Sequence, residues 1–147
     1  MEKLESILLV EDDTDIQEIA RLALSSIGGF RVTVCSSGEE ALQKVLHVKP
    51  QLILLDVMMP NMDGPTTLKN LKQIPDAGFI PVVFITAKIQ ENEVKSYKKM
   101  GVLDVIPKPF DPLTLSETVL EIWKNMLKNT QTTMDFIQGS TFKPTNK

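Results

Sequence analysis

The stretch Leu52-Ile53-Leu54-Leu55-Asp56 decides how this chain folds. Its four apolar residues have the length and composition of a strand that is buried on both faces. A carboxylate follows them directly, and the loop-forming segment Val57-Met58-Met59-Pro60-Asn61-Met62-Asp63-Gly64 comes next. Burying an unpaired charge at the end of such a strand is expensive, so Asp56 needs a partner or a cation close by.

Three other apolar runs also end in polar side chains. Ile7–Val10 leads into Glu11-Asp12, Val82–Ile85 into Thr86, and Val102–Pro107 into Lys108. If these strands are parallel, their carboxyl ends meet at one edge of the sheet. That edge would then hold three acids, one hydroxyl and one lysine, a set suited to a divalent cation and a phosphoryl group.

The chain alternates strand and helix patterns five times. The strands are expected at 6–10, 30–35, 51–55, 80–85 and 102–106, and the helices near 13–27, 36–48, 64–74, 90–100 and 111–128. Such alternation predicts an α/β fold with a doubly wound, five-stranded parallel sheet and right-handed crossovers. A flavodoxin-like strand order, 2-1-3-4-5, would place the acids at its switch point, where ligands bind.

Three helices have patterns that a structure can test. The first should be capped near Asp13 and should present one apolar stripe, which consists of Ile16, Ile19, Ala20, Ala23 and Ile27. The fourth carries few apolar residues among many lysines, so it is expected to be the most mobile element. The fifth has a broad apolar stripe around Trp123, which favours a place in the core.

Bulk composition excludes several classes of protein. A chain of 147 residues with 42% hydrophobic and 24% charged residues is expected to form one globular domain. A net charge of −3 argues against direct nucleic-acid binding. No apolar run is long enough to span a membrane. Cys35 is the single cysteine, which fits a reducing cytoplasm.

The composition changes at about residue 129. We expect a domain over residues 1–128 and a polar, flexible C-terminal tail over 129–147, with a short apolar island at Met134, Phe136 and Ile137. A tail that folds when it binds a partner is the alternative. No second domain or DNA-binding motif fits into so few residues.

In the order in which they occur, the motifs resemble those of a known family. The segments Leu8-Leu9-Val10-Glu11-Asp12-Asp13, Asp56–Gly64, Thr86-Ala87 and Lys108-Pro109-Phe110 are similar to those of the response-regulator receiver domain of two-component signalling. The resemblance covers about residues 4 to 128. It implies a CheY-like, single-domain receiver that catalyses only its own phosphorylation and dephosphorylation and is not an enzyme in the usual sense.

Within this reading Asp56 is the phosphoacceptor, because its carboxylate can attack phosphorus and form a mixed anhydride. A phosphoryl group approaching three carboxylates needs a cation, and Mg²⁺ (or Mn²⁺) is suited to oxygen ligands. Asp12 and Asp56 are the expected direct ligands, and Glu11 is expected to act through water. The resemblance adds the backbone carbonyl of Met58.

The other site residues have roles around the phosphoryl group. Lys108 is expected to pair with Asp56 and later with a phosphoryl oxygen, and the resemblance implies a cis bond between Lys108 and Pro109. Thr86 offers a hydroxyl that can donate to a phosphoryl oxygen, and the small side chain of Ala87 leaves room for the phosphoryl group to enter. The expected donor is a histidine kinase or a histidine phosphotransfer protein. We also expect a downstream protein target and no association with a membrane. The protein is expected to be a monomer or a weak homodimer.

One position departs from the family pattern, and two others are the ones that tune the lifetime of the phosphorylated state in the family. Receivers usually have an aromatic residue three positions before the lysine, and Val105 stands there. The switch of the fourth helix and fifth strand is therefore expected to start from Thr86 and its following loop. Met58 cannot orient a hydrolytic water well, and with Lys88 it occupies a position that tunes lifetime. A phosphorylated state that lasts minutes or longer is expected.

Some of these residues also fit other roles. Acids before a helix often serve as caps, and we assign this role to Asp13 and Asp15. His47 is expected on a helix surface, and Cys35 as a small buried hydrophobe. A phosphorylation-independent adaptor with the same fold is the alternative function. A haloacid-dehalogenase type phosphohydrolase is disfavoured, since Met58 occupies the position of its second acid.

Overall fold

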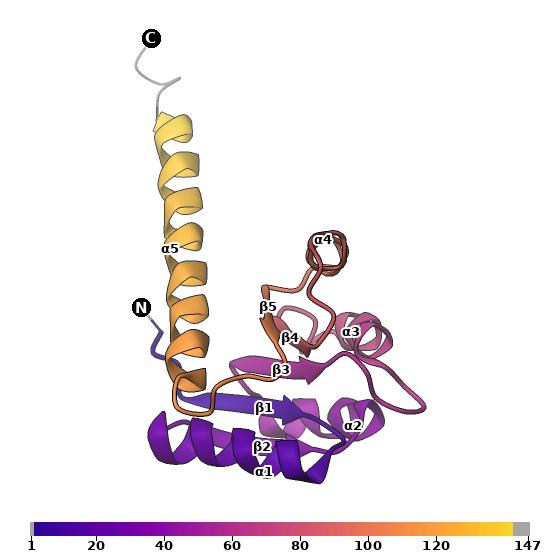
Figure 1. Ribbon diagram of the computed structural model, residues 1–147. Helices are drawn as coiled ribbons and strands as arrows, with labels where there is room; N and C mark the ends of the chain where they lie inside the picture. Colours follow the sequence, from indigo (N-terminus) through magenta and orange to yellow (C-terminus); the bar gives the residue numbers. More distant parts are fainter. Residues whose placement is uncertain (1, 143–147) are drawn as a thin grey trace.

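The computed structural model describes residues 2–142 and contains one five-stranded parallel sheet (Figure 1). Its strands are β1 (Ser6–Val10), β2 (Arg31–Cys35), β3 (Leu52–Asp56), β4 (Val82–Thr86) and β5 (Asp104–Pro107). The spatial order is β2-β1-β3-β4-β5, and every neighbouring pair is parallel. The predicted flavodoxin-like order is therefore confirmed, and each strand lies within two residues of its expected position at either end.

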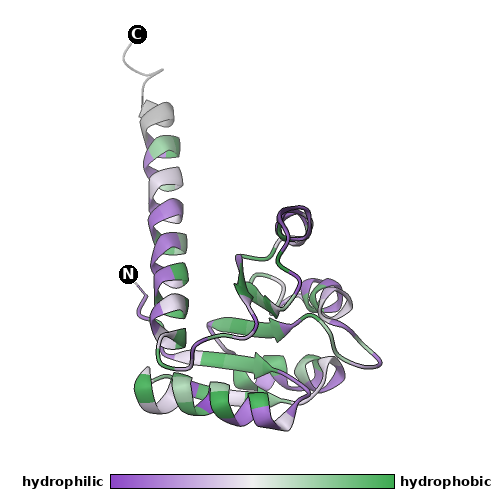
Figure 2. Cartoon of the chain, in the orientation of Figure 1, coloured by the Kyte–Doolittle hydropathy of each residue, from purple (hydrophilic) through white to green (hydrophobic). Residues whose placement is uncertain are grey.

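Helices cover both faces of the sheet. They are α1 (Thr14–Leu22) with the π-helical turn η1 (Ala23–Ile27), α2 (Gly38–Val48), α3 (Gly64–Lys72), α4 (Glu91–Lys99) and α5 (Leu115–Phe142). α1, η1 and α5 pack on one face, and α2, α3 and α4 pack on the other. This two-sided cover explains why the central strands are continuous apolar runs, which Figure 2 shows in green.

Alternate residues of each strand supply the two halves of the core. In β1, Ile7 and Leu9 face α1 and α5, whereas Leu8 and Val10 face α2 and α3. Trp123 is buried in the first half, where its indole nitrogen donates a hydrogen bond to the backbone oxygen of Glu2 at 3.1 Å. The prediction that Trp123 belongs to the core is confirmed.

The apolar stripe expected for the first helix is only partly correct. Ala20 and Ala23 are buried, but the side chains of Ile19 and Ile27 are 47% and 55% exposed. Leu24, which the stripe omitted, is fully buried. The π-helical turn, in which Gly28 N–H donates to the carbonyl of Ala23 five residues earlier, rotates the residues after Ala23 and accounts for the exposure of Ile27, whereas Ile19 lies before this turn.

The last helix differs most from the sequence expectation. We predicted that it ends near residue 128 and that an irregular tail follows, yet α5 continues to Phe142. Figure 1 shows its second half standing clear of the rest of the molecule. Hence the segment 129–142 is helical, although its composition is polar. Among residues 2–142, no helix combines the length and apolar character that crossing a bilayer requires.

Candidate functional site

The carboxyl edge of the sheet gathers the polar residues that follow four strands. Val10 in β1 aligns with Leu55 in β3, Asp56 with Ile85 in β4, and Thr86 with Pro107 in β5. Glu11, Asp56, Thr86 and Lys108 thus lie at or directly after the carboxyl ends of four neighbouring strands, along one edge of the sheet that Figure 1 shows. The grouping expected from parallel strands is present.

An acid cluster forms at the β1 and β3 ends. Glu11, Asp12 and Asp56 each offer a carboxylate oxygen, and these oxygens lie within 4.8 Å of one another. Glu11 and Asp56 are buried, whereas Asp12 is exposed. Three carboxylates at such distances repel one another unless a cation lies between them.

Lys108 supplies one such cation. Its Nζ lies 2.8 Å from Glu11 Oε1 and 3.1 Å from Asp56 Oδ1, so a single ammonium pairs with two buried acids. Burial lowers the pKa of Lys108, but its hydrogen bond to Glu11 and the two negative charges outweigh burial and raise the pKa above its ordinary value. The Lys108–Pro109 peptide bond is cis, as the family resemblance implied.

Glu11 is held by more than the lysine. Its Oε2 accepts a hydrogen bond from the backbone N–H of Asp13 at 3.1 Å. Burial raises the pKa of Glu11 to about 7, although the hydrogen bond from Lys108 acts in the opposite direction. Both oxygens of Glu11 thus have a hydrogen-bond partner, and burial still disfavours the charged form of this carboxyl.

Asp13 is a helix cap, as expected. Its Oδ1 accepts hydrogen bonds from the backbone N–H groups of Asp15 and Ile16 at 2.9 and 3.1 Å. Gln17 has a role that we did not predict: its side-chain nitrogen donates to the carbonyl of Glu11 at 2.5 Å and to Ser36 Oγ at 3.0 Å. Gln17 thereby fixes the loop that carries the acids, and no motif in the sequence pointed to it.

Thr86 ends β4 with a buried hydroxyl. Its Oγ1 accepts a hydrogen bond from the backbone N–H of Lys88 at 3.0 Å. A hydroxyl that accepts one hydrogen bond still has its own hydrogen to donate. Ala87 follows at an exposed position.

The loop between β3 and α3 also contacts the acid cluster. The backbone N–H of Met58 donates to Asp56 Oδ1 at 3.3 Å, and its side chain is 61% exposed. Gly64 starts α3, where an added Cβ would lie 2.7 Å from the carbonyl oxygen of Asp56 and 2.8 Å from Val57 Cα. Glycine is needed here because the helix start lies so close to the strand end.

Several residues with predicted positions lie away from this edge. His47 is exposed near the end of α2, and Cys35 is buried at the end of β2, both as expected. Burial raises the pKa of the Cys35 thiol to about 11. Val105 is half-buried in β5 and packs against the half of the core that contains Tyr97 of α4.

The donor set of the cluster fits a hard divalent cation. Its oxygens come from carboxylates, with backbone carbonyls nearby, and it contains no sulfur or imidazole ligand. Mg²⁺ favours such oxygen ligands and commonly retains several waters. The partly exposed position of Asp12 leaves the solvent side open for water and for an incoming group.

Comparisons with known proteins agree with this geometry. The family model for the response regulator receiver domain matches residues 7–134. A probable C4-dicarboxylate response regulator, DctR of Halalkalibacterium halodurans, is 31% identical over 139 residues, which cover 91% of this chain and 59% of that protein. The chain therefore spans about three fifths of that relative's length.

Solved structures give the same result. The chemotaxis protein CheY4 of Vibrio cholerae has a TM-score of 0.75 at 27% identity, covering 82% of this chain and 99% of that one. A putative response regulator from Chloroflexus aurantiacus has a TM-score of 0.73 at 32% identity, covering 82% and 98%. The chain belongs to the response regulator receiver domain family, the signalling domain of two-component systems.

Proposed function

We propose that this receiver domain accepts a phosphoryl group on Asp56 from a phosphohistidine donor in a Mg²⁺-dependent reaction. The observation that carries the proposal is the placement of a buried Asp56 carboxylate within 4.8 Å of two other acids and 3.1 Å from Lys108 Nζ. A structural ion pair would need one acid for one lysine. Three acids around one lysine leave negative charge that a bound divalent cation would neutralise.

Asp56 is the nucleophile. One of its carboxylate oxygens forms a bond to phosphorus while the phosphorus–nitrogen bond of phosphohistidine breaks. The electron pair of that bond stays on the imidazole nitrogen, which then takes up a proton. Met58 N–H donates to Asp56 Oδ1, and Lys108 lies against the same oxygen, so these contacts fix the orientation of the carboxylate.

The acid cluster would hold the cation. Asp12 and Asp56 are the proposed direct carboxylate ligands, the backbone carbonyl of Met58 is a third, and Glu11 acts through water. Mg²⁺ (or Mn²⁺) would neutralise the negative charge of the carboxylates and of the incoming phosphoryl oxygens. Lys108 keeps its contact with Glu11 on the other side of the cluster.

After transfer, Lys108 and Thr86 would bind the phosphoryl oxygens. Lys108 can exchange its contact with Asp56 for a phosphoryl oxygen without losing its pair with Glu11 at 2.8 Å. Thr86 can donate its hydroxyl hydrogen while it continues to accept from Lys88 N–H. Ala87 leaves the approach open. We expect Thr86 and its following loop to transmit the change to α4 and β5, since Val105 has no ring to reorient.

The biological role follows from this chemistry. A histidine kinase or a histidine phosphotransfer protein would be the donor, and a protein that binds the α4 and β5 face would read the phosphorylated state. The domain would catalyse only its own phosphorylation and dephosphorylation, in the cytoplasm. A phosphorylation-independent adaptor is the alternative, and the close approach of Asp56, Lys108 and the other acids speaks against it.

Intact-mass spectrometry tests the proposal. The protein is incubated with acetyl phosphate, with and without Mg²⁺, beside Asp56→Asn. A gain of one phosphoryl group that requires Mg²⁺ and is absent in the variant supports the acceptor chemistry. No gain, even with an authentic phosphohistidine donor, would favour the adaptor.

A further inference from the structure

The second half of α5 is a helix without a domain beneath it. We call residues 129–142 the α5 extension. Every side chain described in it, from Asn129 to Gln138, is exposed. Figure 1 shows this segment projecting past the N-terminus, away from the sheet. The described side chains of the extension therefore contribute little buried surface to the domain.

The composition of the α5 extension is poor for an isolated helix. Its residues include Thr130, Thr132 and Thr133, whose hydroxyls each donate to the carbonyl four residues earlier at 3.0 Å. Such back-bonding slightly destabilises a helix, and threonine has a low helix propensity. The anchored first half of α5 provides the helix nucleus, but each turn added beyond residue 128 gains little by itself, so a contact from outside would stabilise the extension.

The spacing of apolar residues indicates the form of that contact. Leu127, Thr130, Met134 and Ile137 follow one another at intervals of three, four and three, which is the heptad spacing of a coiled-coil seam. Met134 and Ile137 are 48% and 52% exposed. Phe136, two positions after Met134, lies about 200° around the helix at about 100° per residue, and so falls on the opposite side.

We propose that the α5 extension forms an antiparallel helical pair with the same segment of a second copy of this chain. In the coiled-coil layers Leu127 would pack on Ile137 of the second copy, and Thr130 on its Met134. The two-fold relation repeats both layers, so the surface is complementary to itself. The seam is short, and we expect a weak dimer, with a dissociation constant roughly in the micromolar range.

The antiparallel orientation follows from where the domain sits. The same seam continues backwards to Leu120 and Trp123, and Trp123 is only 4% exposed because it already packs on its own sheet. A parallel second helix would bring its own domain into the space that this domain occupies. An antiparallel pair overlaps only the projecting halves and places the two domains at opposite ends.

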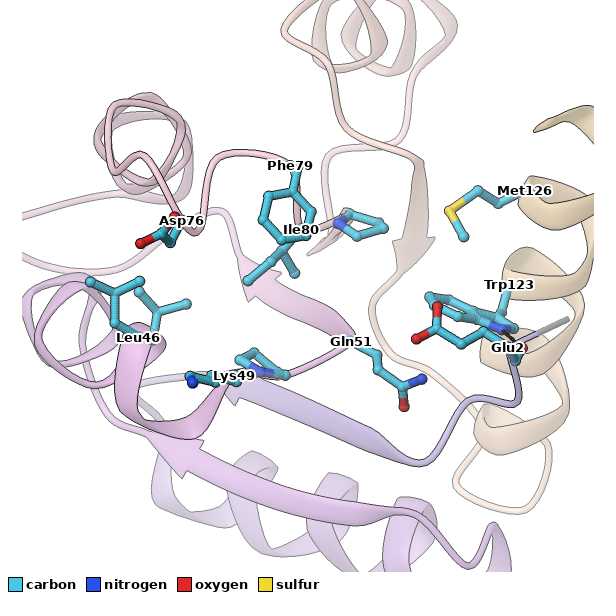
Figure 3. A pocket seen from close by; sticks show the side chains of 12 residues that line it. Glu2, Leu46, Lys49, Gln51, Asp76, Phe79, Ile80, Trp123 and Met126 are labelled. Atoms are coloured by element: carbon cyan, nitrogen blue, oxygen red, sulfur yellow. Dashed lines mark hydrogen bonds between the residues drawn. The ribbon is translucent and has the colours of Figure 1, made fainter. Parts of the chain in front are cut away.

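A groove at the foot of the extension supports this orientation. It has a volume of about 630 Å³ and is lined by Met126 and Trp123 of α5 and by Phe79 and Ile80 before β4. Figure 3 shows Met126 and Trp123 facing Phe79 across this space. Phe79 is 79% exposed. In the antiparallel pair the helix of the second copy ends beside this apolar groove, which extends the contact beyond the seam.

Charge does not oppose self-pairing. The residues that flank the seam in the extension are Gln131, Thr133 and Gln138, and all three are uncharged. Flanking charges normally select or reject a partner helix in a coiled coil. Their absence means that an identical helix meets no like charge, and that no oppositely charged partner is specified.

Sedimentation equilibrium of the full chain, unphosphorylated, tests the pairing. We expect the mean mass to rise toward twice that of one chain with concentration. Met134→Asp should weaken the dimer at least about a hundredfold, because the change enters the seam twice. Phe136→Asp introduces the same charge on the side of the helix opposite the seam and should leave the dissociation constant of the dimer nearly unchanged. A monomer at all concentrations, or equal effects of both variants, would overturn the proposal.

Disulfide trapping tests the orientation. Thr130→Cys and Met134→Cys are made separately, with Cys35 retained because it is buried. A mixture of the two variants should cross-link rapidly on oxidation, whereas each alone should do so slowly. Rapid cross-linking of each variant with itself would overturn the antiparallel arrangement. These experiments need no phosphoryl transfer and can be repeated on Asp56→Asn, so their failure leaves the proposed function untouched.

Discussion

Lys108→Met is the change that most directly tests the electrostatics of the site. The substitution keeps an apolar stem but removes the ammonium that lies 2.8 Å from Glu11 and 3.1 Å from Asp56. At an effective dielectric constant of about 20, these two attractions amount to about 6 and about 5 kcal/mol before the cost of burying the lysine is subtracted.

The net loss is smaller than that sum. Breaking a buried ion pair generally costs about 3–5 kcal/mol, because it leaves an uncompensated charge. The side chain of Lys108 is 19% exposed and the acid side chains only 3% and 4%, so solvent screens the pair slightly. We therefore expect Lys108→Met to lower the free energy of unfolding by about 3 kcal/mol in a buffer without divalent cations.

Urea denaturation followed by circular dichroism provides the measurement, in EDTA and then in excess Mg²⁺. Mg²⁺ bound to the folded state should stabilise the variant more than the wild type, because it meets three carboxylates with no competing ammonium. The difference in the free energy of unfolding between the variant and the wild type should therefore be smaller in Mg²⁺ than in EDTA, by half or more. A loss of packing alone would give a difference that Mg²⁺ does not change.

Lys44→Met is the matched control. Lys44 also pairs with a carboxylate, Glu40, at 2.6 Å, but both groups lie on the surface of α2. Surface pairs contribute little to stability, so this variant should unfold like the wild type in both buffers. If Lys108→Met is no less stable than Lys44→Met in EDTA, or if Mg²⁺ leaves its deficit intact, our account of the site is wrong.

Three further predictions concern the loop, the thiol and the switch. Gly64→Ala should lower the free energy of unfolding by about 1–3 kcal/mol, measured in urea, and slow phosphorylation of Asp56, because its Cβ would press on backbone atoms 2.7 and 2.8 Å away; unchanged stability and rate would contradict this. Burial raises the pKa of Cys35 to about 11, so its neutral thiol contributes stability that is complete below the ordinary thiol pKa and is lost as pH rises through about 11. A thiol reagent at pH 8 should therefore label unfolded protein only, and fast labelling of folded protein would refute the burial argument. Phosphorylation should shift the NMR amide signals of residues 87–105, and unchanged signals would refute the proposed switch. The phosphorylated state should last minutes or longer without a phosphatase, because Met58 cannot orient a hydrolytic water well. Loss of the phosphoryl group within seconds would refute this second prediction.

The sheet and its polar edge were predictable because burial leaves a strong pattern. Strands covered on both faces must be apolar throughout, so an acid such as Asp56 or a lysine such as Lys108 at the end of a run is conspicuous. Parallel pairing then brings such ends together whatever the loop lengths. The contact of Lys108 with Glu11, in addition to Asp56, was not predicted, since no spacing rule fixes which acid a flexible lysine reaches.

Two features were not predictable for identifiable reasons. The exposure of Ile27 depends on the π-helical turn Ala23–Ile27, because a stripe drawn with ordinary helical spacing places Ile27 inside. The helical form of residues 129–142 contradicts their local propensity, which is that of a tail. A propensity argument considers one chain at a time, so it misses a helix that we propose a second copy stabilises.

The site and the α5 extension represent two different kinds of incomplete structure. At the sheet edge, the acids at Glu11, Asp12 and Asp56 outnumber the single lysine, so the fold keeps a charge imbalance that a cation and a phosphoryl group would together resolve. Such an imbalance costs stability and is retained where ligand binding depends on it. In the extension the deficit is apolar contact at Met134 and its neighbours, which a cation cannot supply and a second helix can. The two deficits therefore respond to different changes. Mg²⁺ should raise the free energy of unfolding without changing the mean molar mass in solution. A higher protein concentration should raise the mean molar mass even without Mg²⁺.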